Sequence, residues 1–244
     1  MTARGADRDA PAAADGGALS DHEAQALAQG LHGDPFARLG LHADAGGRLW
    51  ARAMLPGAER VAIIEAGSGR VVRWLDRRRD DGLFESSIPV RRKRFDYRLR
   101  IQWPLGVIEE RDDPYRFGPL LGDTDLWLLG EGRHLRPYET FGAHPRVVDG
   151  VPGTAFAVWA PNARRVSVVG EFNHWDGRVH PMRRRGASGV WELFLPSVGE
   201  GARYKFELIG PDGARLPQRA DPYALRAELR PATASVVAAL PATV

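Results

Sequence analysis

Arg52-Ala53-Met54-Leu55-Pro56-Gly57 is a stretch that this chain uses twice, because Ala157-Val158-Trp159-Ala160-Pro161-Asn162 repeats its pattern in the second half. In each copy an apolar run ends in a proline-containing turn, which is typical of a half-buried strand at a hairpin. Other pairs recur in the same order, from Phe36 with Tyr138 to Pro114 with Pro222, and the offset between partners hardly changes along the copies. The chain therefore contains an internal repeat with few insertions.

Short alternating runs surround the repeated stretch. In the first copy they cover residues 49–55, 60–64, 71–75, 83–88 and 95–101. In the second copy, residues 191, 193 and 195 alternate on one expected strand and residues 204, 206 and 208 on the next, so we expect these two apolar faces to meet in a core. Turns rich in Gly, Pro and Asp separate these runs, and no helical pattern lies between them. Strands at this spacing are typical of a β-sandwich. We therefore expect an all-β protein made of two tandem immunoglobulin-like β-sandwiches.

The segments outside the strands allow the domain boundaries to be predicted. Ser20 and Glu23 have capping-box spacing, which favours a short helix. The run Leu126-Trp127-Leu128-Leu129 is too apolar for a free linker, so we expect the two sandwiches to pack together. The expected parts are a disordered tail at 1–19, a short helix at 20–32, a first sandwich at 33–125, a connector at 126–137 and a second sandwich at 138–240.

The composition excludes several classes of protein. Of the 244 residues, 43% are hydrophobic and 27% are charged, as in soluble globular proteins. There is no cysteine, which excludes disulfides, thiolate metal sites and a cysteine nucleophile, and which fits a reducing cytoplasm. The sequence has neither an apolar run of about 18 residues nor a secretory signal pattern. We therefore expect a cytoplasmic protein that does not enter a membrane.

Arginine provides almost all of the positive charge, although the net charge is only +3. Clusters at 77–79, 91–94 and 183–185 make nucleic acid a partner to consider. No recognition helix, zinc-ligand spacing or aromatic RNA-binding motif accompanies them. Nucleic-acid binding is therefore the least favoured of the functions we consider.

The segment 170–177 is a polar turn that contains a tryptophan between two apolar runs. Its Asn, Asp and Gly residues suit a tight turn because they tolerate positive φ or bond their own backbone. Trp175 has two interpretations. An exposed indole can stack on the flat apolar face of a sugar ring, whereas a buried one would close the end of the sandwich core. The sequence leaves both open.

No set of residues supports catalysis or metal binding. Catalysis by a pair of carboxyl groups needs the two groups close together, and the one that acts as the acid needs a raised pKa. Glu171 and Asp176 flank the turn on an expected solvated loop, so we reject them for this role. The histidines lack metal-ligand spacing and there is no phosphate-binding loop, so we expect neither a metal nor a cofactor. His42 and His144 hold the same place in both copies, and we expect each to bond a backbone carbonyl.

An ordered set of stretches connects the chain to a known family. The set comprises Asp34-Pro35-Phe36, Gly130-Glu131-Gly132-Arg133-His134-Leu135, Gly142-Ala143-His144, Thr154 to Ala163, Gly170 to Gly177, His180-Pro181-Met182-Arg183, Ala220-Asp221-Pro222-Tyr223 and Arg230 to Val236. With this set the chain resembles the N-terminal portion of bacterial 1,4-α-glucan (glycogen) branching enzymes. The resemblance implies two β-sandwich modules, the second of carbohydrate-binding family 48 type. The catalytic (α/β)8 barrel of that family needs about 250 further residues.

The second copy also resembles the glycogen-binding module of the AMP-activated kinase β subunit, in which two tryptophans stack on glucose and a lysine bonds hydroxyls. The turn around Asn173 carries over the first tryptophan as Trp175, and Lys205 carries over the lysine. The second tryptophan falls near Leu216, which is not aromatic, and an asparagine expected near Ser235 is missing. The resemblance therefore implies a weak carbohydrate site at Asn173, Trp175, Lys205 and Leu216.

The resemblance implies that the chain is the non-catalytic N-terminal part of a glycogen branching enzyme. Such a part positions α-1,4-glucan chains for transfer to a 6-hydroxyl, and its partners are glycogen or maltooligosaccharides and the catalytic barrel of the parent enzyme. By itself the chain is expected to be inactive. The alternative is a stand-alone α-glucan-binding or regulatory module, which a second stacking tryptophan would favour.

Overall fold

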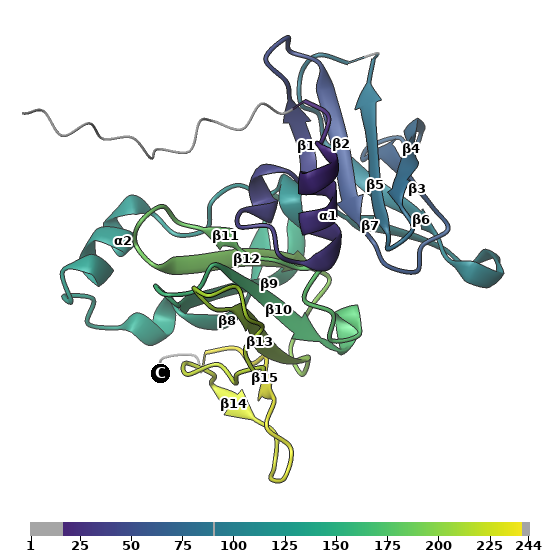
Figure 1. The fold of residues 1–244 in the computed structure, drawn as a ribbon. Coiled ribbons are helices and arrows are strands. Elements are labelled where there is room, and N and C mark those ends of the chain that lie inside the picture. The colour runs from purple at the N-terminus through teal and green to yellow at the C-terminus, as the bar shows by residue number, and fades with distance from the viewer. Residues whose placement is uncertain (1–16, 90, 241–244) are drawn as a thin grey trace, which may run out of the picture.

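The computed structural model describes residues 17–89 and 91–240. Figure 1 shows two β-rich bodies with helix α1 (Asp21–Gln29) where they meet. Apart from α1, α2 (Asp123–Gly130) and short 3-10 turns, the regular structure of the described residues is β, so the all-β prediction is confirmed. The disordered tail expected at 1–19 lies almost wholly outside the described residues.

Helix α1 begins at the capping box that the sequence predicts. The Glu23 N–H donates to Ser20 Oγ at 3.2 Å, and the Ser20 N–H donates to the Glu23 carboxylate at 3.1 Å. The helix ends at Gly30, whose φ of 69° suits a residue without a Cβ atom. The apolar face of α1 packs on the first sandwich, in a cluster with Leu39, Met54 and Leu83.

The first sandwich is one seven-stranded sheet that folds over on itself. Its strands are β1 (Gly40–Ala43), β2 (Leu49–Met54), β3 (Arg60–Glu65), β4 (Val71–Arg79), β5 (Leu83–Ile88), β6 (Tyr97–Gln102) and β7 (Ile108–Asp112), in the order β1-β2-β5-β4-β3-β6-β7. The first half of β4 pairs with β3 and the second half with β5, where the register shifts between Arg77 and Arg79. Such a strand makes the corner of a sandwich, because each half belongs to a different layer.

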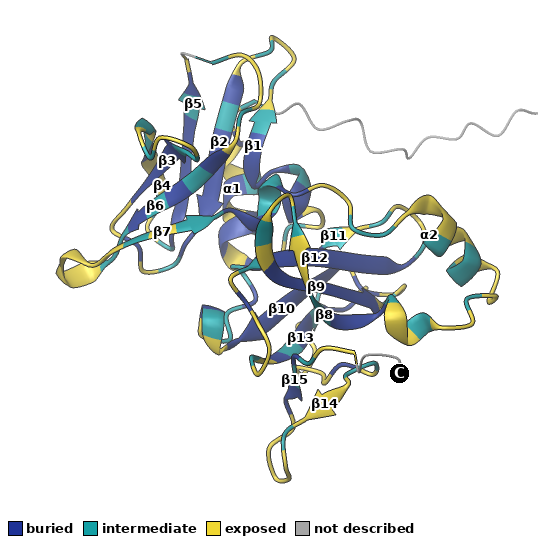
Figure 2. Cartoon of the chain, turned by 180° about the vertical axis from the view of Figure 1, so that it is seen from behind, coloured by how far each residue is buried: buried dark blue, intermediate teal, exposed yellow. Residues whose placement is uncertain are grey.

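The second sandwich has two separate sheets, ordered β10-β13-β15-β14 and β11-β12-β9-β8. Its strands are β8 (Gly142–Val148), β9 (Val151–Trp159), β10 (Arg165–Gly170), β11 (Arg183–Arg184), β12 (Val190–Pro196), β13 (Arg203–Ile209), β14 (Arg226–Ala227) and β15 (Ser235–Val236). Alternate residues of β12 and β13 meet in one core, as the sequence alternation predicts, and Figure 2 shows both strands largely buried. These residues are Trp191, Leu193, Leu195, Tyr204, Phe206 and Leu208.

Helix α2 shows that the repeat is longer than the sequence pattern indicated. Its first residue, Asp123, follows Asp21 at the start of α1 by the same offset that relates Phe36 to Tyr138. A glycine with positive φ follows each helix, Gly30 at 69° and Gly132 at 66°. Part of the segment expected to be a connector is therefore the second copy of the helix that precedes the first sandwich.

Equivalent glutamates attach the segment before each helix to its own sandwich. Glu85 accepts from the Leu19 N–H at 2.9 Å, and Glu192 accepts from the N–H groups of Leu120 and Leu121, each at 3.0 Å. Both glutamates are buried, so these bonds form away from solvent. The charges are neutralised by arginines: Arg52 beside Glu85, and Arg183 and Arg185 beside Glu192.

Buried polar pairs also recur between the copies. The Tyr97 hydroxyl donates to Asp113 at 2.7 Å, and the Tyr204 hydroxyl donates to Asp221 at 2.6 Å. Each pair ties an inner strand of a sandwich to the segment that leaves it. The predicted histidine contacts are present as well: His42 Nε2 lies 2.7 Å from the Leu39 carbonyl oxygen, and His144 Nε2 lies 2.9 Å from that of Phe141.

The two sandwiches are in contact, as we expected, but through α1, Phe36 and Tyr115 rather than through residues 126–129. A Cβ atom on Gly30 would overlap the Arg165 guanidinium, so the end of α1 lies directly against the second sandwich. The Tyr115 hydroxyl donates to the Val179 carbonyl at 3.1 Å across the same junction. The apolar part of α2 instead packs on the outer face of the second sandwich.

Candidate functional site

Asn173 fixes the turn that follows β10. Its side-chain oxygen accepts from the Gly170 N–H at 2.9 Å, and its Nδ2 donates to the Val168 carbonyl at 2.9 Å. Nδ2 also lies 3.0 Å from His180 Nδ1. Because Asn173 is buried and its polar atoms are engaged, its contribution to a sugar site would be to hold the turn rather than to touch a ligand.

Trp175 lies two residues after Asn173. Both His174 and Trp175 have a left-handed backbone conformation, with φ of 53° and 60°. The Trp175 N–H donates to the Gly170 carbonyl at 2.9 Å, so the backbone of the turn is closed. The indole is half-buried and does not belong to the core cluster, against which Phe172 packs instead. The structure therefore gives the core-closing position to Phe172 and leaves Trp175 partly accessible.

Lys205 lies on β13, on the face opposite the buried Tyr204 and Phe206. It pairs in register with Val169 of β10 and is half-buried. Its ammonium group donates to Thr233 Oγ1 at 2.7 Å. A sugar hydroxyl that reached Lys205 would share or replace this bond.

Leu216 lies on the other face of the same sheet. Arg215 forms a bridge with Ile209 of β13, and its guanidinium lies 3.7 Å from Glu207, so Arg215 shares the face of Lys205. Leu216 is therefore turned toward the face of Leu208, and its N–H donates to the Leu208 carbonyl at 2.9 Å. The structure does not bring Leu216 and Lys205 together on one surface.

The turn folds back over the outer face of β13. A Cβ atom on Gly177 would overlap the Glu207 carboxylate, so the backbone of the turn lies directly against this side chain. Beneath it, Glu207 forms an ion pair with Arg165, and both side chains are buried. The outer face of β13 thus carries Arg203, which contacts Glu171 of the turn, and Glu207, which Gly177 covers, with Lys205 between them.

The carboxylates of the turn are held in ion pairs. Glu171 contacts Arg203, and Asp176 contacts Arg178 at 2.6 Å. Partial burial raises the pKa of Asp176, but hydrogen bonds from the Arg178 side chain and backbone more than offset this effect, so the pKa lies below its usual value. A general acid needs a raised pKa, which Asp176 does not have.

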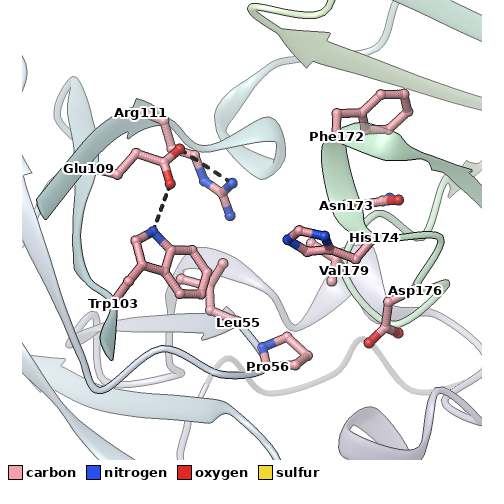
Figure 3. Close-up of a pocket in the computed structure, with 10 residues that line it drawn as sticks. All are labelled: Leu55, Pro56, Trp103, Glu109, Arg111, Phe172, Asn173, His174, Asp176 and Val179. Carbon is pink, nitrogen blue, oxygen red and sulfur yellow. Dashed lines mark hydrogen bonds and ion pairs between the residues drawn. The ribbon is translucent and has the colours of Figure 1, made fainter. Parts of the chain in front are cut away.

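A cleft separates the turn from the first sandwich. Its volume is about 450 Å³, and Figure 3 shows the side chains that face each other across it. The first sandwich contributes Trp103, Glu109 and Arg111, and the second contributes Phe172, His174 and Asp176. The sequence alone did not predict this cleft. The signal that the sequence contained was Trp103 beside Pro104, which places a tryptophan in a turn of the first copy, as Trp175 lies in a turn of the second.

His180 supports the turn from below. It is buried, and this burial, with a smaller contribution from the positive charge of Arg111, lowers its pKa to about 3. His180 is therefore neutral near pH 7. Since Asn173 Nδ2 is a donor, His180 Nδ1 acts as the acceptor of that contact.

The arginine clusters make many contacts within the chain. Arg77 donates to the carbonyls of Ala58 and Glu59, both at 2.8 Å. Arg185 donates to the Glu192 carboxylate and to the Leu121 carbonyl at 2.7 Å. These contacts give the clusters a role in the fold.

Among residues 17–89 and 91–240, no group of three or more His, Cys, Asp or Glu side chains is arranged to hold a metal ion. None of the helices formed by these residues has the length and apolar character needed to cross a membrane.

Two family models match the chain. Residues 20–115 match the N-terminal domain of the alpha-1,4-glucan branching enzyme GlgB, and residues 140–224 match carbohydrate-binding module 48, the isoamylase N-terminal domain. The protein is thus a tandem β-sandwich protein whose second sandwich matches the carbohydrate-binding module 48 family. The order of the two domains is that of the N-terminal region of a GlgB-type glycogen branching enzyme, the family that the sequence motifs indicated.

One individual relative agrees with these matches. The chain is 54% identical over 224 residues to the 1,4-alpha-glucan branching enzyme GlgB of Roseobacter denitrificans, covering 90% of this chain and 30% of that protein. The chain therefore spans less than a third of the length of this relative.

Two solved structures are also similar to the chain. PulA from Klebsiella oxytoca has 20% sequence identity and a TM-score of 0.34, and the match covers 78% of this chain and 20% of that chain. Pullulanase complexed with maltotetraose, from Anoxybacillus sp. LM18-11, has 16% sequence identity and a TM-score of 0.33, and the match covers 82% of this chain and 26% of that chain.

Proposed function

We propose that the chain is the non-catalytic, glucan-binding part of a glycogen branching enzyme, and that it positions α-1,4-glucan chains for transfer to a 6-hydroxyl. The observation that carries the proposal is the 54% identity to a branching enzyme over 90% of the chain. The chemistry of transfer would belong to a catalytic barrel, which is the second partner we propose. We also propose that the protein works in the cytoplasm, because a chain without cysteines forms no disulfides and needs no oxidising compartment.

Within the second sandwich we propose that Trp175 stacks on a glucose ring and that Lys205 bonds its hydroxyls. A rigid turn holds the tryptophan, so little conformational entropy is lost when a ligand binds. Only one aromatic side chain is provided, because Leu216 is not aromatic and also faces the other side of the sheet. The site is therefore weak by itself, and it would act by adding to the affinity of other sites along a long glucan chain.

The test is a maltoheptaose titration of the full chain and of Trp175→Ala. We expect the substitution to remove the binding that the turn provides. It should lower the free energy of unfolding by less than about 2 kcal/mol, because the side chain is half-buried and outside the core. The matched control is Trp127→Ala, since Trp127 is 57% exposed on α2. Equal losses of affinity in both variants would contradict the assignment.

We further propose that the sandwiches at 33–125 and 138–240 are separate folding units, because each has a core built mainly from its own residues, with Phe36 of the first part also packed in the second core. Cleavage near Glu131 should then give two fragments that each unfold cooperatively, the first of them less stable than in the whole chain because the contact of α1 with the second sandwich is lost. Absence of a cooperative transition in both fragments would refute this division.

A further inference from the structure

The cleft between the sandwiches has the properties of a ligand site that is independent of Trp175. Its walls come from two bodies that are far apart in sequence, and its volume of about 450 Å³ lies in the range of small-molecule sites. We propose that this cleft binds a segment of an α-1,4-glucan as a second saccharide site. The class of ligand rests on the proposed function; the site itself rests on the geometry of the cleft.

The aromatic wall of the cleft is fixed before a ligand arrives. The Trp103 indole N–H donates to Glu109 Oε2 at 2.8 Å, which sets the orientation of the ring, as Figure 3 shows. One part of the indole packs on the first core, and the rest lines the cleft. A rigid aromatic plane with polar groups at its edge suits a pyranose ring, whose flat faces are apolar and whose rim carries hydroxyls.

The charges of the cleft favour a neutral ligand. Glu109 lies 3.6 Å from Arg111 on one wall, and Asp176 lies 2.6 Å from Arg178 on the other. Each carboxylate is thus neutralised by a guanidinium, while both remain able to bond a hydroxyl. A phosphate or carboxylate ligand would find as much negative as positive charge. A neutral polyhydroxylated ligand avoids that repulsion and uses both kinds of group.

The site is also longer than one sugar ring. A second cavity of about 230 Å³ shares Glu109, Arg111 and Phe172 with the cleft and continues along β7. Strand β7 is the edge of the first sheet, so no further strand of the described residues covers this side. An extended chain of sugar units would run along this edge and touch both sandwiches.

The experiment is ¹⁹F NMR of the full chain labelled with 5-fluorotryptophan, which gives one resonance for each of the seven tryptophans. Trp103→Phe and Trp175→Phe assign the two relevant signals. We expect maltoheptaose to shift the Trp103 resonance with a saturable curve, and sucrose to leave it unchanged. A constant Trp103 resonance up to the solubility limit of maltoheptaose, or an equal response to sucrose, would overturn the proposal.

A variant that removes one charge from the cleft tests whether the shift of the Trp103 resonance comes from a ligand bound in the cleft itself. Glu109→Gln keeps an acceptor for the indole N–H but removes the charge, so we expect about tenfold weaker binding at Trp103, the effect of losing a charged hydrogen bond. The titration of Trp175 should not change, and Glu131→Gln on the exposed connector should change neither. If Glu109→Gln leaves the Trp103 curve unaltered, the cleft is not the binding site.

A response at Trp103 without one at Trp175 would refute the turn site and leave the cleft site standing, whereas the reverse would refute only the cleft site.

Discussion

Glu192→Gln tests whether one buried carboxylate holds the segment between the sandwiches in place. Glu192 is fully buried and accepts from the N–H groups of Leu120 and Leu121 and from Arg185. Glutamine has the same shape, but one of its two terminal atoms is a donor. At least one backbone N–H must then face another donor, and Arg183 and Arg185 lose the charge that neutralises them.

The magnitude follows from the burial of the partners. Breaking a buried ion pair costs about 3–5 kcal/mol when the remaining charge stays buried. The Arg183 and Arg185 side chains are 21% and 12% exposed, so water can partly hydrate them. We therefore expect a loss of about 3 kcal/mol, which corresponds to a fall in Tm of about 10 °C or more for a sandwich of this size.

Urea denaturation measures the loss of stability, and amide hydrogen exchange locates it. We expect the Leu120 and Leu121 amides to lose their protection in Glu192→Gln before the strands do. The matched control is Glu139→Gln, which removes an exposed pair with Arg136 and should change the stability by less than about 1 kcal/mol. Unchanged exchange at both leucines, with a loss no larger than in the control, would refute this account of the attachment.

Three further predictions concern the second sandwich and the chain as a whole. Arg215→Trp should strengthen maltoheptaose binding and Leu216→Trp should not, because residue 215 shares the face of Lys205 and residue 216 does not. A titration in which only Leu216→Trp gains affinity would contradict the pairing of residue 215 with Ile209 on which this prediction depends. Below pH 6.5 the unfolded chain binds a proton at His180 that the native chain does not, so the free energy of unfolding should fall by about 1.4 kcal/mol per pH unit toward the native pKa of about 3. Urea midpoints measured from pH 7 to pH 5 should depend less steeply on pH in His180→Gln than in the unaltered chain. Equal dependence on pH in both proteins would exclude this linkage. The chain alone should produce no α-1,6 branches in amylose, and a shift of the iodine-stain spectrum with pure protein would disprove this.

Much of the fold could be predicted because it depends on local patterns. The alternation in β12 and β13 identified the residues of the second core, and the capping box identified the start of α1. The repeat gave the equivalent histidines, since each needs only a nearby carbonyl, that of Leu39 or of Phe141. The family was also recognisable, because its motifs are contiguous short stretches whose order survives in the sequence.

Less of the candidate site could be predicted, because it depends on how distant segments meet. Whether residue 215 or 216 faces Lys205 is decided by the pairing across the hairpin after β13, and a shift of one position reverses the face of every side chain. The equivalence of α1 and α2 was not predicted because the two helices have different sequences, although they share an offset, a glycine with positive φ after the helix and their glutamate attachments. Trp103 and the turn of the second sandwich lie far apart in the sequence, and they face each other because α1, Phe36 and Tyr115 hold one sandwich against the other. The sequence by itself determined the family, most of the longer strands and the inward faces of β12 and β13. The tertiary structure decided the surfaces, since a surface is made by residues whose proximity no local pattern encodes.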